Sequence, residues 1–331
     1  MNQDQVCRYQ VKIGIVGAGA VGGLLGGMLR AAGHDVLFLG RGQHLQAMQQ
    51  NGLLIKFATS QRKTLRIKGR FSDEVKDLSD RELLLFTVKS TQTKEMMGRL
   101  LPHLKAGAIV ITLQNGVDNE EILAQALGEE RLLSGAAYLS AEIESPGVIE
   151  VHSSGLQLII GYLDGRQSQD LTRLVGLFNQ AGVHCRPSAK IMERKWHKLL
   201  WNVTFNPLSA ATGETIGEIL DDAELHQTAR RVLKEAVQVA EALQVSVRRD
   251  IETVVFQGAE EARGHKTSML QDREQGKPME IESICGYFVH QAAQLGLRTP
   301  TIHTLYSILL AIDKKRYGQH GNKGAETSEP D

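Results

Sequence analysis

The sequence predicts an α/β protein in which a Rossmann-type, doubly wound parallel sheet is followed by an all-α C-terminal domain. Two observations support this prediction. In the first half of the chain, short apolar runs alternate with runs of helical period, which is typical of a parallel sheet covered by helices. Beyond Pro187, almost every segment has the period of a helix.

The elements of the first half follow from this alternation. The expected strands are Val11–Gly17, Val36–Leu39, Leu53–Phe57, Thr64–Lys68, Glu82–Val88 and Ala108–Leu113, and the expected helices are Ala20–Ala32, Arg41–Asn51, Thr91–Leu101 and one that opens at Asp118. The runs 53–57 and 64–68 alternate in the manner of a hairpin. From Leu132 to Gly161 the pattern is rich in strands again.

The second half predicts a helical domain. The expected helices are Ile191–Ala211, Ala223–Leu243, Arg249–Arg263, Glu282–Leu295 and Thr301–Tyr317. We therefore expect a dinucleotide-binding domain over residues 10–187 and a helical substrate domain over 188–315. Residues 316–331 are polar and lack apolar anchors, which predicts a disordered tail.

Composition excludes several functional classes. Lys plus Arg and Asp plus Glu are 38 each, so the formal net charge is zero and nothing indicates a nucleic-acid partner. The three cysteines are distant and odd in number, and the histidines are scattered, so we expect a reduced, cytoplasmic protein without a metal site. Met1–Gln10 lacks the pattern of a signal peptide.

One apolar stretch, Val11–Leu29, is nearly long enough to cross a membrane. Seven of its positions are glycine, and each glycine costs a helix about 1 kcal/mol relative to alanine. A strand, a glycine turn and a helix explain this composition better, so we expect no membrane partner.

The turn Gly17-Ala18-Gly19-Ala20-Val21-Gly22 has the spacing G-x-G-x-x-G between an expected strand and an expected helix. In a dinucleotide-binding turn, Gly17 permits the tight bend, Gly19 lets the backbone approach a pyrophosphate, and Gly22 lets the helix pack closely on the sheet. A glycine-rich packing turn is the alternative.

The second strand indicates which dinucleotide binds. Sites that prefer NAD place a carboxylate at the tip of this strand, but here the tip reads Leu39-Gly40-Arg41, and Asp35 lies at the opposite end. Arg41 suits the 2′-phosphate of NADP(H), which is therefore the expected cofactor. A solvated arginine at the start of a helix is the alternative.

Polar residues follow two further strands at their carboxyl ends, where ligands bind in open α/β sheets. Lys89 follows one, and Gln114-Asn115-Gly116 follows the next. Taken singly, these residues are better explained as a surface lysine and a turn asparagine.

A polar row marks the helical domain. Lys198, Asn202 and Asn206 recur every four residues among apolar neighbours, so they share one face of a helix. Buried polar groups need partners, which a polar substrate would supply, although a polar ladder between helices is an alternative. Ser268 and Glu280 come later and are, by themselves, a helix-start serine and a first-turn carboxylate.

These motifs, in this order and over residues 10 to 315, together resemble the ketopantoate reductase family. The resemblance implies NADPH-dependent reduction of ketopantoate to pantoate, in the route to pantothenate and coenzyme A. It further implies that Lys198 is the general acid and that Glu280 is its electrostatic partner and a neighbour of the cofactor. By the same resemblance, the residues that bind substrate are Asn202, Asn206 and Ser268. Asn115 would lie where cofactor and substrate meet, and Lys89 near the cofactor.

The chemistry of the residues agrees with this resemblance. A ketone that accepts a hydride develops negative charge on oxygen, so a proton donor such as lysine must face it. Two alternatives stay open: a reductase of another branched 2-keto acid, and a non-catalytic dinucleotide sensor, which would have no use for Lys198 and Glu280. A helical second domain often supplies a homodimer interface, but no exposed apolar stripe can be distinguished from the core, so the sequence leaves the oligomeric state open.

Overall fold

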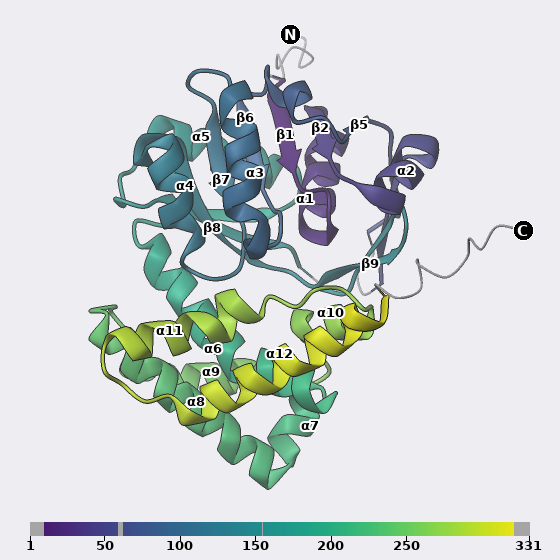
Figure 1. Cartoon of the computed structure of the whole chain (residues 1–331). Coiled ribbons are helices and arrows are strands. Elements are labelled where there is room, and N and C mark those ends of the chain that lie inside the picture. The colour runs from purple at the N-terminus through teal and green to yellow at the C-terminus, as the bar shows by residue number, and fades with distance from the viewer. Residues whose placement is uncertain (1–9, 59–61, 154, 321–331) are drawn as a thin grey trace, which may run out of the picture. The chain divides into compact units, whose positions relative to one another are not determined.

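A computed structural model describes residues 10–58, 62–153 and 155–320. Within these, residues 10–114 and 119–192 form one compact unit, and residues 115–118 and 193–320 form another. The first unit contains all the strands of the described chain, and the second is helical apart from its loops (Figure 1). The predicted fold class is confirmed.

The first unit is built on an eight-stranded sheet in the order β12-β11-β8-β7-β6-β1-β2-β5. Its strands are β1 (Lys12–Val16), β2 (Asp35–Leu39), β5 (Arg70–Ser72), β6 (Leu83–Phe86), β7 (Ile109–Thr112), β8 (Leu132–Tyr138), β11 (Gln157–Tyr162) and β12 (His184–Pro187). All neighbouring strands are parallel except β8 and β11, which pair antiparallel. Because β1 lies between β2 and β6, the strand order reverses at β1, which is where ligands bind in sheets of this type.

A second, four-stranded sheet in the order β4-β3-β10-β9 completes the first unit. Its strands are β3 (Leu53–Phe57), β4 (Leu65–Ile67), β9 (Ala141–Ser145) and β10 (Val148–Val151). The predicted hairpin-like pair is confirmed, because β3 and β4 are antiparallel neighbours.

Helices cover both faces of the larger sheet (Figure 1). They are α1 (Ala20–Ala31), α2 (Gly42–Asn51), α3 (Thr93–Leu100), α4 (Asn119–Leu127) and α5 (Gln169–Gln180). One apolar core joins alternate residues of β1 and β2 with α1, α5 and the smaller sheet, so α1 is packed between two sheets. The other core joins the opposite face of β2 and β6 with α3 and α4. The stretch 11–29 thus forms β1, a turn and α1. No helix in the described part of the chain is long and apolar enough to span a bilayer.

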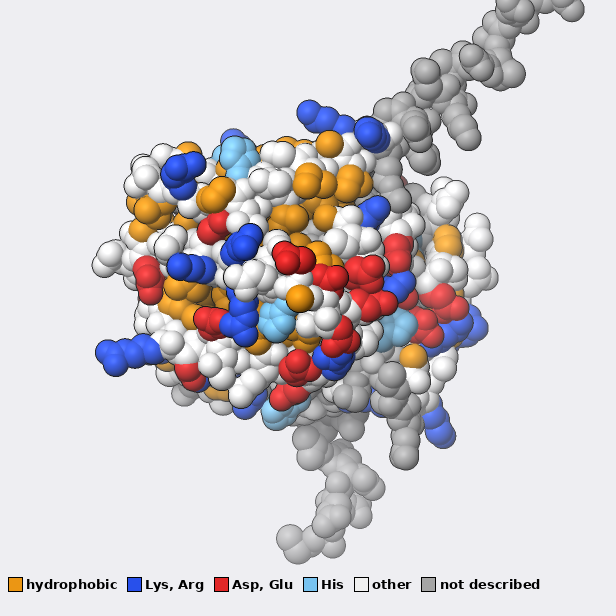
Figure 2. All heavy atoms as spheres, turned by 90° about the horizontal axis from the view of Figure 1, so that it is seen from below, with side chains coloured by type: hydrophobic (Ala, Val, Ile, Leu, Met, Phe, Trp, Pro, Cys, Tyr) orange, Lys and Arg blue, Asp and Glu red, His pale blue; other side chains and the backbone are white. Residues whose placement is uncertain are grey.

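The second unit consists of helices α6 (Ile191–Thr212), α7 (Ile216–Asp221), α8 (Ala223–Ala242), α9 (Ile251–Glu261), α10 (Ser268–Glu274), α11 (Tyr287–Gln294) and α12 (Pro300–His320). A π-helical turn, η5 (Glu282–Gly286), precedes α11. Because α12 continues to His320, it includes the first residues of the predicted tail; residues 321–331 lie outside the described residues, as do 1–9. Figure 2 shows one face of the molecule, on which acidic and basic side chains are intermingled, in keeping with the zero net charge.

Candidate active site

Three strand ends of the first unit carry the predicted cofactor residues. Val16, the last residue of β1, is in register with Leu39 of β2 and with Phe86 of β6. The glycine turn, Arg41 and Lys89 each follow one of these ends. The sheet therefore brings the three predicted cofactor segments to one edge, at the strand where the order reverses.

The glycine turn is fixed by hydrogen bonds to its neighbours. Gly17 has a φ of +104°, and the amides of Gly17 and Ala18 donate to the Leu39 carbonyl over 3.2 and 2.8 Å. The Thr87 hydroxyl donates to the Gly17 carbonyl over 2.7 Å. A Cβ atom on Gly22 would lie only 2.3 Å from both the Gly17 carbonyl oxygen and the Thr87 hydroxyl, so this position requires glycine. Thr87 was not singled out from the sequence.

The same turn fits a bound dinucleotide. Gly19 precedes α1 without a side-chain cap, and a Cβ atom placed there would meet no described atom within 4 Å. Ala20 and Val21 form the first turn of α1, where the amides of a helix have no partner within the helix. Free amides, the positive end of a helix dipole and open space beside Gly19 are what a pyrophosphate needs.

Arg41 and Lys89 lie on the two flanking strand ends. Arg41 is exposed and precedes α2, and its two terminal nitrogens donate to the Gln92 side-chain oxygen over 3.0 and 2.7 Å when the Gln92 amide is oriented to accept them. Gln92 ends the short 3₁₀ turn η2 (Ser90–Gln92), which Lys89 immediately precedes. The side chain of Gln92 therefore holds the guanidinium of Arg41 at the carboxyl edge of the sheet, a contact that the sequence pattern did not predict.

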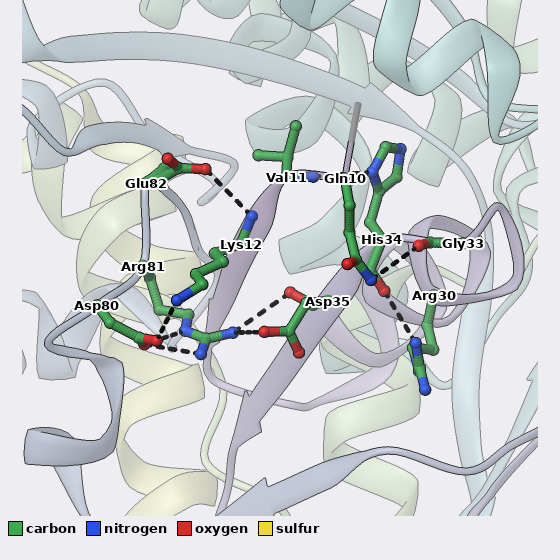
Figure 3. Close-up of polar contacts among 10 residues, drawn as sticks. All are labelled: Gln10, Val11, Lys12, Arg30, Gly33, His34, Asp35, Asp80, Arg81 and Glu82. Carbon is green, nitrogen blue, oxygen red and sulfur yellow. Dashed lines mark hydrogen bonds and ion pairs between the residues drawn. The ribbon is translucent and has the colours of Figure 1, made fainter. Parts of the chain in front are cut away.

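Asp35 forms an ion pair at the opposite, amino end of the sheet (Figure 3). Its carboxylate lies 2.9 Å from the Arg81 guanidinium, which is fully buried and also pairs with Asp80 at 2.7 Å. Lys12 contacts the same Asp80 carboxylate at 3.0 Å. The carboxylate of β2 thus has a structural partner away from the strand tips.

Gln114, directly before Asn115, has a structural role. It is 5% exposed, and its side-chain nitrogen donates to the Val88 carbonyl over 2.9 Å and to the Thr93 hydroxyl over 2.8 Å. These bonds tie the end of β7 to the segment that carries Lys89.

The helical unit brings three predicted residues together. The Lys198 ammonium donates to Asn115 Oδ1 over 3.2 Å, and Asn115 Nδ2 donates to Glu280 Oε2 over 3.0 Å. Glu280 is 8% exposed, and Lys198 is partly buried. Residues 115–118 are the loop that follows β7 in sequence, yet they group with the helices. A cation, an amide and a carboxylate therefore form one connected array, which we call the Lys198–Asn115–Glu280 array.

The loop and the π-helical turn pack closely beside this array. Gly116 has a φ of +87°, and a Cβ atom on it would lie 3.2 Å from Ser283 Cβ and 3.3 Å from the Ser283 carbonyl oxygen. Ser283 belongs to η5, which begins two residues after Glu280. π-helical turns occur frequently at functional sites. Glycine at position 116 permits the close approach that seats Asn115 against Glu280.

The rest of the polar row on α6 is buried. Asn202 is 7% exposed and Asn206 is 2% exposed. The side-chain oxygen of Asn206 has no hydrogen-bond partner among the described residues. A buried amide oxygen without a partner costs stability, so this atom indicates a place for a ligand donor.

The electrostatics of Lys198 involve a residue that the sequence pattern did not identify. The pKa of Lys198 is lowered to about 8, mainly because burial disfavours the charged form; the charge of Lys195 also lowers it, and the carboxylate of Glu280 opposes both. Lys195 is 4% exposed and precedes Lys198 by three residues. The i, i+3 spacing, which places Lys195 on the same helix face as Lys198, is the pattern that could have revealed it.

Ser268 is not joined to the array. It is an exposed residue at the first position of α10, and no hydrogen bond among the described residues links it to Lys198, Asn115 or Glu280. The residue that caps α10 is the buried Thr267, whose hydroxyl accepts from the Leu270 amide over 3.2 Å. The contribution of Ser268 to substrate binding therefore stays a prediction.

Comparisons with known proteins identify the family. A family model described as ketopantoate reductase PanE/ApbA matches residues 13–165, and one described as ketopantoate reductase PanE/ApbA C terminal matches residues 190–313. The 2-dehydropantoate 2-reductase of Mesorhizobium japonicum is 30% identical over 331 residues, covering 93% of this chain and 100% of that protein. The enzyme of the same name from Pyrococcus horikoshii is 32% identical over 303 residues, covering 91% and 97%.

A solved structure leads to the same family. The crystal structure of a PanE/ApbA family ketopantoate reductase from Ralstonia eutropha JMP134 has a TM-score of 0.85 and 31% identity, covering 93% of this chain and 100% of that one. The resemblance inferred from the sequence motifs is confirmed, and the chain belongs to the ketopantoate reductase family of dinucleotide-dependent oxidoreductases.

Proposed function

We propose that this protein is a 2-dehydropantoate 2-reductase, which reduces ketopantoate to pantoate with NADPH. The observation that carries the proposal is the Lys198–Asn115–Glu280 array, in a chain whose relatives are named for this reaction. Reduction of a ketone needs a proton donor beside the oxygen, and the array supplies a partly buried lysine with a defined hydrogen-bond partner.

In this proposal a bound nicotinamide supplies the hydride to the keto carbon. The electron pair of the carbonyl π bond then takes a proton from the Lys198 ammonium, so the ketone becomes a hydroxyl and Lys198 becomes neutral. Lys198 regains its proton from solvent after turnover. Asn115 holds the ammonium in place through its Oδ1 atom, and Glu280 favours the charged form of Lys198.

The substrate is expected along the polar row of α6. Asn202 and Asn206 lie one and two turns beyond Lys198, and their amides both donate and accept, which suits a keto group that becomes a hydroxyl. The unpartnered oxygen of Asn206 can accept from a substrate hydroxyl. Ser268 is proposed as a further donor to the substrate carboxylate.

The choice of NADPH rests on the tips of the strands. The side chain at the tip of β2 is Arg41, which suits a 2′-phosphate, and no carboxylate occupies the tip. Lys89 is proposed to lie beside the dinucleotide and Glu280 close to its nicotinamide. Gly17, Ala18, Gly19, Ala20, Val21 and Gly22 are proposed to hold the pyrophosphate, since this turn has the open space and free amides described above.

A substrate panel tests the proposal. Oxidation of NADPH by the purified protein is followed with ketopantoate and with other branched 2-keto acids, and each assay is repeated with NADH. We expect ketopantoate with NADPH to give the highest kcat/KM. A clear preference for another keto acid would contradict the substrate, and equal use of NADH would contradict the cofactor. Tight NADPH binding without turnover on any substrate would indicate a sensor.

A further inference from the structure

Lys195 extends the polar face of α6 toward the start of the helix. It precedes Lys198 by three residues and Asn202 by seven, and these spacings place all three on one helix face. Its side chain is 4% exposed, so it belongs to the buried interior and not to a solvated surface. A second lysine therefore occupies the same buried face, one turn before the candidate proton donor.

The orientation of this face is fixed by aromatic packing. Trp196, between the two lysines, is 6% exposed and packs edge-on against Tyr287 at 5.7 Å and Phe288 at 6.1 Å between ring centroids. Because these rings lie on α11, they restrict rotation of the first turns of α6. The aromatic contacts therefore hold the helix face that carries both lysines in one orientation.

Two like charges in this arrangement repel each other. Side chains at i and i+3 have Cβ atoms about 5–6 Å apart, and the repulsion is stronger where water is excluded. Three of the groups that act on Lys198 are the amide of Asn115, the carboxylate of Glu280 from the segment before η5, and Lys195 on its own helix. Glu280 favours the ammonium form of Lys198, and Lys195 disfavours it.

We propose that Lys195 is a positioning residue of this site, whose buried positive charge makes Lys198 a stronger proton donor to the keto oxygen. This inference rests on the proposed role of Lys198 as general acid. Lys195 would thereby influence both directions of the reaction. Ketone reduction needs Lys198 charged, and its rate falls as pH rises through the pKa of Lys198; alcohol oxidation needs Lys198 neutral, and its rate rises over the same range.

The pH dependence of kcat/KM tests the inference. Lys195→Met removes the charge and keeps the length of the side chain. In this variant we expect the alkaline limb, which is the pH range in which kcat/KM for ketopantoate reduction falls, to lie about one pH unit higher. The limb of pantoate oxidation should move up by the same amount. Lys195→Arg retains the charge and should keep both limbs in place. Lys234→Met removes an exposed lysine from α8 and is the control for net charge.

Direct titration separates this inference from the proposed function. The side-chain carbon resonance of Lys198 is followed by NMR in the wild-type protein and in Lys195→Met, and its assignment is checked with Lys198→Arg. A higher pKa of Lys198 in Lys195→Met supports the inference whether or not the protein turns over ketopantoate. If Lys198→Arg keeps wild-type turnover, the general acid of the proposed function is wrong, but the titration still reports on Lys195.

An unchanged titration of Lys198 in folded Lys195→Met overturns the inference. An equal shift in Lys195→Arg also overturns it, because the effect would then be one of shape and not of charge. Circular dichroism and NADPH binding establish that each variant is folded. If Lys195→Met does not fold, Lys195→Gln is measured in the same way.

Discussion

Asn115 and Glu280 are 165 residues apart in the sequence, and Asn115 Nδ2 donates to Glu280 Oε2 over 3.0 Å. The same asparagine accepts from Lys198 through Oδ1. One amide therefore separates a cation from a carboxylate and contacts both. Through this arrangement the carboxylate of Glu280 lies close enough to raise the pKa of Lys198 and so to favour its charged form.

Replacement of Glu280 should move the pH profile in the direction opposite to replacement of Lys195. Glu280 raises the pKa of Lys198, so in Glu280→Gln that pKa should fall further below about 8. Glutamine can still accept from Asn115, which leaves the geometry in place. We expect the alkaline limb of kcat/KM for reduction to move down by about one pH unit. An upward movement would show that Glu280 acts by some other means than its charge.

Loss of Lys198 should reduce chemistry more than binding. We expect Lys198→Ala to lower kcat by about 10²–10⁴-fold, the usual scale for removal of a general acid. Lys198→Arg keeps the charge but donates a proton poorly, so its kcat should also fall steeply. Affinity for NADPH, measured by fluorescence titration, should stay within about twofold of the wild type in both variants. Lys234→Ala on α8 is the control, and near-normal turnover of Lys198→Ala would remove Lys198 from the mechanism.

Much of the fold could be predicted because its buried parallel strands and long helices have strong periodicity. α5 was missed even though Ser168 caps it and its buried residues have helical spacing, because it lies between short strands that dominate the local pattern. The antiparallel pairing of β8 and β11 was not predicted, since a strand that is buried on both faces carries no mark of its direction. Nor did any pattern predict the π-helical turn η5.

The candidate site was predictable where residues share one element or follow one sheet edge. Lys198, Asn202 and Asn206 share a helix, and the glycine turn and Arg41 follow strand ends. Contacts between distant segments were not predictable from spacing, as the bonds of Asn115 to Glu280 and of Arg41 to Gln92 show. Lys195 escaped notice because a lysine in a charged stretch ordinarily lies in solvent.

Asn206 should show a conflict between stability and function. Its buried Oδ1 atom has no partner among the described residues, so Asn206→Leu removes an unsatisfied group and keeps the volume. We expect the free energy of unfolding without ligand to stay constant or rise by about 1 kcal/mol, as measured by urea denaturation. The KM for ketopantoate should rise at least about tenfold, because a substrate hydrogen bond is lost. A loss of several kcal/mol would mean that Asn206 has a structural role.

Arg41 should distinguish the two nicotinamide cofactors. If its guanidinium meets a 2′-phosphate, Arg41→Ala should raise the KM for NADPH by about 10–100-fold and leave the KM for NADH within about twofold. Arg99→Ala removes an exposed arginine from α3 and is the matched control. Equal effects on both cofactors would assign Arg41 to a general electrostatic role. Steady-state kinetics with each cofactor at saturating ketopantoate measures both KM values.

The buried Arg81 at the amino end of the sheet should govern stability in acid. Burial acts to raise the pKa of Asp80, but hydrogen bonds from Arg81 and Lys12 outweigh it and lower that pKa to about 2. Because the folded value lies below the ordinary 3.8, Asp80 contributes stability that is present above pH 4 and lost as pH falls from 4 to 2.

We expect Arg81→Met to destabilise the protein by about 2 kcal/mol at pH 7, less than for a fully buried pair, because Asp35 and Asp80 are partly exposed. Between pH 4 and 2, Arg81→Met should lose less stability than the wild type, because the pKa of Asp80 would then lie closer to its ordinary value. Denaturant unfolding at a series of pH values measures both effects. Lys12→Met retains Arg81 and should reproduce only part of the change in slope. A slope in Arg81→Met equal to that of the wild type would assign the acid sensitivity to other carboxylates.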